Sequence, residues 1–160
     1  MPPRLDAIVT ELATADKQDR IELLIDFAKS LKPLPERLHG LRDATHRVEE
    51  CQSPVYLFVE RAAGDQVRLF ADAPIEAPTV RGFVSILLEG LDGASADEIL
   101  AVPSDLVDRI GMPEILGMLR VHGLNGVLRR LKSEVARSEL IASAAHSRDT
   151  PELTSVESKP

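Results

Sequence analysis

A run of five apolar residues, Val55 to Val59, most constrains the fold of this chain. Pro54 directly precedes it, and proline is tolerated at the first position of a strand. Continuous apolar β-formers are typical of a strand that is buried on both faces. Gly64-Asp65 then gives a turn signal, and Gln66 to Asp72 predicts a second strand. We therefore expect a meander of two or three antiparallel strands, with a short first strand near Val48.

Helical patterns flank this predicted sheet on both sides. Apolar residues recur at three- and four-residue spacing over residues 4–14 and 16–31, which predicts two helices. Pro33 ends the second of them. The same periodicity predicts a helix over residues 80–91. Four further helices are expected: a short one opened by the capping box Ser95–Glu98, short ones over 104–110 and 113–119, and a long amphipathic one marked by Leu124 to Val135.

Strands that cluster between helices indicate an α+β fold, in which helices pack against one face of a small antiparallel sheet. A chain of 160 residues can bury a core without disulfides or metals. From residue 143 onward the composition changes to Ser, Thr, Glu, Pro and Lys without an apolar stripe. We therefore predict one domain over residues 1–142 and a disordered tail over residues 143–160.

The charge and composition of the chain exclude several classes of partner. The net charge of −7 and the pI near 5.1 argue against nucleic acids and anionic membranes. No apolar run approaches the roughly 18 residues that would span a membrane, and the N-terminus lacks the apolar core of a secretory signal. A single cysteine cannot form an intrachain disulfide, so we expect a cytoplasmic protein whose thiol is reduced.

That cysteine, Cys51, lies in a polar bend directly before the apolar strand. Lone cysteines are usually small buried apolar residues. Polar neighbours and a loop position on a rigid strand favour a reactive thiol instead. Glu49 and Glu50 would disfavour the thiolate if their carboxylates lie close. Positive groups that could favour the thiolate are present at His46, Arg47 and Arg120.

Two other interpretations of Cys51 stay open. In the first, the chain is a non-catalytic adaptor and the cysteine is merely structural. In the second, it is a cysteine-dependent hydrolase, which needs a histidine base and an oxyanion hole, although a strand rather than a helix follows the cysteine. The histidines available for that role are His39, His46, His122 and His146. A metal site made from His39, His46 and Cys51 lacks a fourth ligand with recognisable spacing, so no metal is expected.

The chain has no glycine-rich phosphate loop. Gly123 and Gly126 match no phosphate-loop spacing, and we interpret them as the flexible start of the last helix. The basic outer face of that helix is interpreted as a solvated surface, in keeping with the acidity of the whole chain.

The stretch Cys51-Gln52-Ser53, followed by Val55-Tyr56-Leu57, resembles the SufE family of sulfur-acceptor proteins. That family carries Gly-Cys-Gln-Ser before a strand that usually reads Val-Trp-Leu. Glu50 stands where the family has Gly, and a positive φ there would cost Glu about 1 kcal/mol or more. Four further segments match in order: Leu34-Pro35, Phe70-Ala71-Asp72, Val80-Arg81-Gly82-Phe83, and Arg120 with Gly123-Leu124.

The resemblance implies a SufE-like two-layer sandwich that carries a persulfide and is not itself an enzyme. The acceptor thiolate would take sulfur from a SufS-like, pyridoxal-phosphate-dependent cysteine desulfurase, stimulating it, and would relay the sulfur to a SufBCD-like iron–sulfur scaffold. Cys51 is the expected persulfide-forming residue, and Arg120, Asp72 and His46 are further candidate site residues. No cofactor is expected on this chain, because pyridoxal phosphate belongs to the desulfurase. A monomer or weak homodimer is expected.

Overall fold

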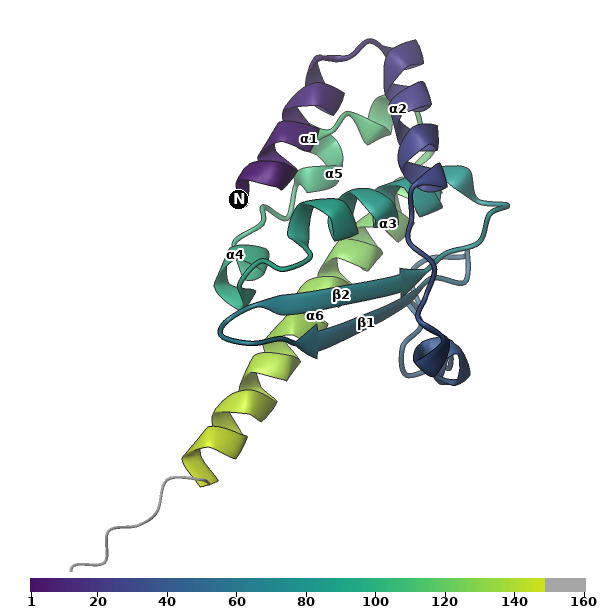
Figure 1. The fold of residues 1–160 in the computed structure, drawn as a ribbon. Helices are drawn as coiled ribbons and strands as arrows, with labels where there is room; N and C mark the ends of the chain where they lie inside the picture. The colour runs from purple at the N-terminus through teal and green to yellow at the C-terminus, as the bar shows by residue number, and fades with distance from the viewer. Residues whose placement is uncertain (149–160) are drawn as a thin grey trace, which may run out of the picture.

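The computed structural model describes residues 1–148, in which helices pack against a small antiparallel sheet (Figure 1). The predicted α+β fold class is confirmed. In chain order the elements are α1 (Pro3–Thr14), α2 (Lys17–Lys29), the 3-10 helix η1 (Glu36–Leu41), β1 (Tyr56–Arg61), β2 (Val67–Asp72), α3 (Pro78–Leu91), α4 (Ala96–Leu100), α5 (Leu106–Arg109), the 3-10 helix η2 (Met112–Glu114) and α6 (Met118–Arg148).

The sheet consists of β1 and β2, which pair in register from Tyr56 opposite Asp72 to Arg61 opposite Val67. The third strand predicted near Val48 is reduced to an isolated bridge between Arg47 and Tyr56. The pairing stays short because, soon after Arg47, the chain turns into the bend that holds the cysteine.

α3 is the central helix of the core and is buried on nearly all sides, because apolar residues occupy most of its surface and not only one stripe. It crosses α2 very closely at Gly82, where a Cβ would lie 2.2 Å from the carbonyl oxygen of Leu24. Beside this crossing, Nε of Arg81 donates to the carbonyl of Ala28 at 2.9 Å. Arg81 and Gly82 therefore join the two helices, which gives a structural reason for both residues at the start of α3.

The buried face of α2 includes a charged residue that periodicity did not predict. Arg20 is only 5% exposed, whereas the apolar side chain of the neighbouring Ile21 is exposed. The guanidinium of Arg20 donates to the carbonyls of Leu12 and Ala15 at 2.9 Å and forms an ion pair with Glu114 at 2.8 Å. Carbonyls at the end of α1 have no partner within the helix, so a buried arginine is used to pair them.

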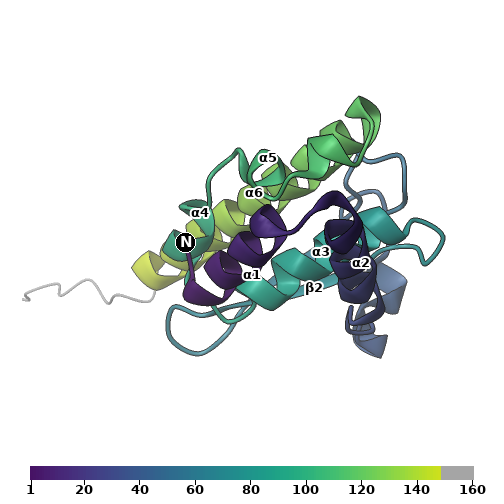
Figure 2. The same cartoon turned by 90° about the horizontal axis from the view of Figure 1, so that it is seen from above.

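The C-terminal helices differ from the prediction in two places. The helix expected over residues 113–119 is only the short turn η2, and α6 begins at Met118 rather than near Leu124. α6 also continues to Arg148, so residues 143–148, assigned to the tail, are helical (Figures 1 and 2). Extending a formed helix through alanines is easy even without an apolar stripe. Residues 149–160 lie outside the described residues, and the tail stays a prediction there.

Within residues 1–148, no helix is both long enough and apolar enough to cross a membrane.

The contact at Gly82 can be tested directly. Gly82→Ala forces a Cβ into the backbone of α2, so we expect the free energy of unfolding to fall by about 1–3 kcal/mol in urea denaturation. Gly40→Ala is the matched control, because a Cβ there meets nothing within 4 Å. Its effect should stay within about 0.5 kcal/mol. Equal effects of the two substitutions would contradict the close crossing of α2 and α3.

Candidate functional site

Residues 49–54 form the loop that holds the cysteine. Two backbone hydrogen bonds close its base: the N–H of Val48 donates to the carbonyl of Val55 at 2.9 Å, and the N–H of Leu57 donates to the carbonyl of His46 at 3.0 Å. The residues before the loop therefore pair with the start of β1. This pairing fixes both ends of the loop on the sheet.

α6 packs directly against this loop because two of its residues are glycines. A Cβ on Gly126 would lie 2.5 Å from the Cβ of Glu50, which is too close for any side chain. A Cβ on Gly123 would lie 3.5 Å from Sγ of Cys51, an ordinary contact. Both glycines are buried within the helix, so their interpretation as a flexible helix start is wrong. They permit a close approach instead.

The presence of Glu50 in place of the family's glycine does not strain the loop. Among the described residues, only glycines have a positive φ. Glu50 therefore adopts an ordinary backbone conformation, and its side chain packs in the space that Gly126 leaves free.

Cys51 is buried at rest, with 3% of its surface exposed. A small cavity of about 80 Å³ opens beside it. The cavity is lined by Cys51, Gln52, Ser53, Val80, Leu119, Arg120 and Gly123. One water takes up roughly 30 Å³ in the liquid, so the space beside Sγ is large enough for one more sulfur atom.

The surroundings of Cys51 act on its thiol in opposite directions. Burial is the largest effect and raises the pKa of the thiol above its ordinary value. The backbone N–H of Ser53, which hydrogen-bonds the sulfur, lowers the pKa, as do the positive charges of Arg47 and Arg120. Glu49 and Glu50 are exposed and do not contribute to the shift. The thiol is therefore protonated at rest, with two cations near enough to favour the thiolate.

Arg120 reaches the site from the first turn of α6. It lines the cavity, and its Nη1 donates to Oγ1 of Thr79 at 2.8 Å. Thr79 lies in the first turn of α3, so this bond connects the starts of the two helices that frame the cavity. The structure thus brings Arg120 to Cys51.

Asp72 and His46, the other predicted site residues, do not line the cavity. Asp72 ends β2 and pairs with Arg42 at 2.9 Å. His46 stacks on Phe58, with ring centroids 4.6 Å apart, and its Nδ1 lies 3.0 Å from Oδ1 of Asp43. The hydrogen bond with His46 is the main reason that the pKa of the Asp43 carboxyl is lowered. Through these contacts with Arg42, Asp43 and Phe58, both residues help to hold residues 42–46, the segment before the loop, in place.

Hydrolysis and metal binding, the other two chemistries considered for Cys51, find little support in the described part of the chain. None of the residues that line the Cys51 cavity is a histidine, so a hydrolase would have no base there. Nor do the described residues contain a group of three or more His, Cys, Asp or Glu that could hold a metal ion.

Comparisons with known proteins agree on one family. A family model described as "SufE: Fe-S metabolism associated domain" matches residues 6–135. An uncharacterised SufE-like protein of Mycobacterium tuberculosis (strain H37Rv) is 40% identical over 139 residues, which are 87% of this chain and 96% of the relative. The sulfur acceptor protein CsdE of Escherichia coli (strain K12) is 30% identical over 111 residues, 69% of this chain and 72% of CsdE.

A solved structure has the same fold. The solution structure of a hypothetical protein from Thermus thermophilus matches with a TM-score of 0.75 and 32% identity, and the match covers 88% of this chain and 98% of that one.

The packing of α6 on the loop gives a paired test. Gly126→Ala should push Glu50 and the loop away, so we expect it to unfold more readily than Gly123→Ala by about 1–3 kcal/mol. Both changes give the same gain in helix propensity, which therefore cancels in the comparison. Urea denaturation of the two variants measures the difference. Indistinguishable free energies of unfolding would contradict the close contact.

The charge of Arg120 can be tested through the pH dependence of thiol alkylation. Because the pKa of Cys51 is raised, the rate should climb with pH and reach half its maximum at a higher pH than in the unfolded chain. Arg120→Ala removes a charge that favours the thiolate, so the midpoint should move to higher pH, and Arg120→Lys should move it less. A midpoint that falls or does not change in Arg120→Ala would contradict this role.

Proposed function

Because the chain belongs to the SufE family, we propose that it accepts sulfur on Cys51 from the persulfide of a cysteine desulfurase and relays it to iron–sulfur cluster assembly. The membership confirms the resemblance first noted in the Cys51-Gln52-Ser53 segment. The similarity to CsdE, a sulfur acceptor protein of E. coli, supports a sulfur-acceptor role. The description of the family model, which refers to Fe–S metabolism, supports the destination of the sulfur.

The observation that carries the proposal is a buried thiol beside a cavity with room for one sulfur atom. In the transfer, the Cys51 thiolate attacks the outer sulfur of the partner's persulfide. A new S–S bond forms on Cys51, and the S–S bond on the partner breaks. The partner's cysteine leaves as a thiolate and takes up a proton, which balances the proton that Cys51 releases. No oxidant is consumed, and a single cysteine on this chain suffices.

Burial of Cys51 suits a carrier, because a persulfide is easily lost to oxidants and small thiols. The same burial requires the loop to open when the partner docks. Two large apolar side chains are exposed at the start of α6: Met118 at 90% and Leu119 at 60%. Leu119 also lines the cavity. Exposed apolar side chains next to a buried reactive group suit a docking surface, and we place the desulfurase there.

The proposal also covers the partners of this chain and where it works. Pyridoxal phosphate would stay with the desulfurase, so this chain would act as an accessory carrier that stimulates its partner. We propose that it works in the cytoplasm, as a monomer or weak homodimer, and delivers sulfur to a SufBCD-like scaffold.

A second candidate function is supported by the same burial. Structural cysteines in cores are inert, and Cys51 belongs to the main apolar cluster of the fold. In that case the chain would be a non-catalytic adaptor that binds its partner without taking sulfur.

Intact mass separates the two candidates. After incubation with a cysteine desulfurase and cysteine, an acceptor gains about one sulfur atom, roughly 32 Da, which reduction removes. Cys51→Ser should show no gain. An adaptor would keep its mass although it binds the desulfurase, and that result would sink the proposal.

The docking surface predicts a second result. The double variant Met118→Asp, Leu119→Asp should accept sulfur from the desulfurase at least about tenfold more slowly, the equivalent of 1.4 kcal/mol of lost partner affinity. Its loading by a small persulfide such as glutathione persulfide should be unchanged, because no docking is involved. Leu140→Asp is the control, since Leu140 is also an exposed leucine of α6. Equal loading of all variants by the desulfurase would place docking elsewhere.

A further inference from the structure

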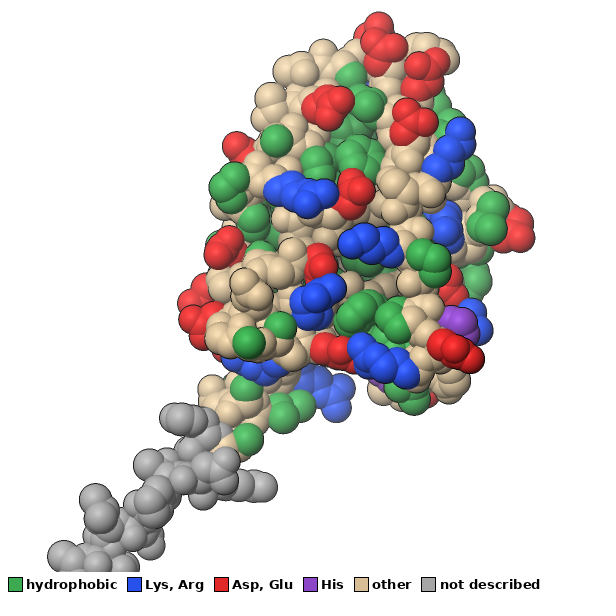
Figure 3. Space-filling model, in the orientation of Figure 1, with side chains coloured by type: hydrophobic (Ala, Val, Ile, Leu, Met, Phe, Trp, Pro, Cys, Tyr) green, Lys and Arg blue, Asp and Glu red, His purple; other side chains and the backbone are tan. Residues whose placement is uncertain are grey.

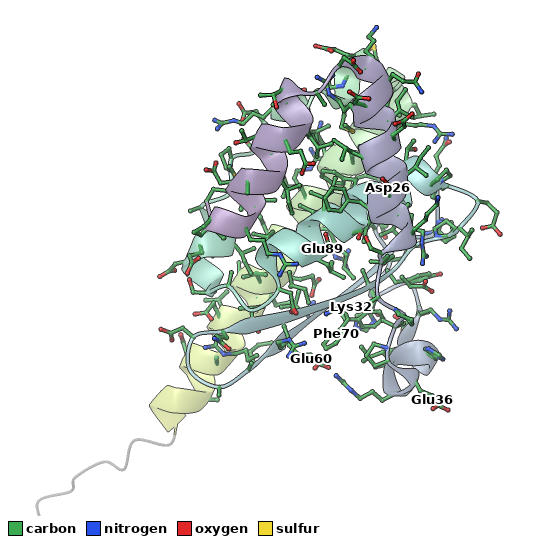
Figure 4. All side chains as sticks on the ribbon, turned by 45° about the horizontal axis from the view of Figure 1, so that its top comes forward. Asp26, Lys32, Glu36, Glu60, Phe70 and Glu89 are labelled. Atoms are coloured by element: carbon green, nitrogen blue, oxygen red, sulfur yellow. The ribbon has the colours of Figure 1, made fainter. Side chains whose placement is uncertain are left out.

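A larger cavity, of about 300 Å³, shares no lining residue with the Cys51 site. It is formed by the first turn of α1, the connection after α2, β2 and α3. Figure 3 shows basic and acidic side chains gathered on this face, over α1 and the sheet. Figure 4 labels Lys32, Phe70 and Glu89, which come from three of the segments that form the cavity.

The wall of this cavity contains an unpaired hydroxyl. Ser85 of α3 is 1% exposed, and its Oγ is the buried side-chain polar atom within the described residues that has no hydrogen-bond partner. A serine inside a helix usually donates to the carbonyl four residues earlier, which Ser85 does not do. Buried polar groups are nearly always paired, so the unpaired hydroxyl of a residue that lines a cavity is a candidate partner for a ligand.

The charges around the cavity favour an anion. Arg68 is paired with Asp92 at 3.1 Å. Arg4 and Lys32 also line the cavity, and neither has an ion pair or side-chain hydrogen bond within the described chain. With Glu89 included, the lining carries one net positive charge, although the whole protein carries −7. An acidic protein thus has a local site that attracts negative charge.

The outer edge of β2 adds a backbone donor. The N–H of Val67 donates to the carbonyl of Ala94, and the N–H of Leu69 donates to Oδ1 of Asp92 at 2.8 Å. Ala71 lies two residues further and presents its N–H on the same edge, because alternate residues of a strand share an edge. Within the described residues it has no partner there, and it lines the cavity.

From these features we propose that the cavity binds a small molecule that combines a carboxylate with an apolar body. The carboxylate would accept from Arg4 or Lys32 and from the free N–H of Ala71, and Ser85 would pair with it through its hydroxyl. Leu31, Leu69 and Leu88 supply an apolar wall for the rest of the molecule. A volume of 300 Å³ lies at the small end of ligand pockets, which suits a ligand the size of an amino acid. This site is independent of sulfur transfer at Cys51.

Three probes that share one branched alkyl chain test the proposal by NMR. The isotope-labelled full chain is titrated with 4-methylpentanoate, leucine and 3-methylbutylamine, which carry a carboxylate, both charges, and an amine. Saturable shifts are expected at the amides of residues 69–71 and 85–89 with at least one of the two carboxylates, and none with the amine. Tighter binding of leucine would show that Glu89 recognises the ammonium group, and tighter binding of 4-methylpentanoate would identify a simple acid. The Cys51→Ser protein should respond identically.

Variants localise the binding. Lys32→Ala and Ser85→Ala should each weaken the affinity at least threefold, whereas Lys29→Ala should leave it unchanged, because Lys29 is an exposed lysine of α2 that does not line the cavity. Ser85→Ala should also melt at a higher temperature without ligand, since it removes an unpaired buried hydroxyl. Absence of saturable shifts with both carboxylates, equal binding of the amine, or equal weakening by Lys29→Ala would overturn the proposal.

Discussion

The close approach of α6 to the loop over residues 49–54 depends on Gly126, whose missing side chain leaves the space that Glu50 occupies. The burial of the thiol and the position of α6 beside it follow from this contact. It brings Gly123 against Sγ, so that Cys51 is buried, and it brings Arg120 and Leu119 to the same cavity. One helix therefore supplies the cover of the thiol, a positive charge beside it and the exposed apolar residue next to it. The hydrogen bonds between the loop ends and β1 hold the other side of the loop in place.

Burial and charge act against each other at Cys51, and their balance suits a carrier. Burial keeps the thiol protonated and protected, while Arg47, Arg120 and the Ser53 N–H reduce the free energy needed to form the thiolate. A partner that opens the loop would remove the largest unfavourable effect and leave the favourable charges in place. Reactivity would then appear only on docking. The cavity beside Sγ provides the space in which a transferred sulfur atom would lie once the loop closes again.

Features that depend on local sequence could be predicted, and those that depend on distant contacts could not. The hairpin followed from an apolar run and a turn signal, and the family followed from the segment at Cys51 together with short segments that match in order along the chain. Periodicity did not reveal Arg20, because its partners are carbonyls at the end of another helix. Likewise, His46 and Asp72 are near the loop in sequence or fold, yet they pair with Asp43 and Arg42 rather than with the thiol. Gly123 and Gly126 did carry a readable signal, since small residues three apart share one helix face and permit close packing.

We propose that α6 and the loop shelter Cys51 until a partner docks. The most direct measurement is the alkylation rate of Cys51 in the folded chain, alone and with a desulfurase whose own reactive cysteine has been replaced, so that no sulfur is transferred. We predict that alkylation of the folded chain alone is much slower than that of the unfolded chain, and that docking accelerates it. Alkylation of the folded chain as fast as that of the unfolded chain, or a rate that docking does not change, would contradict the sheltered thiol.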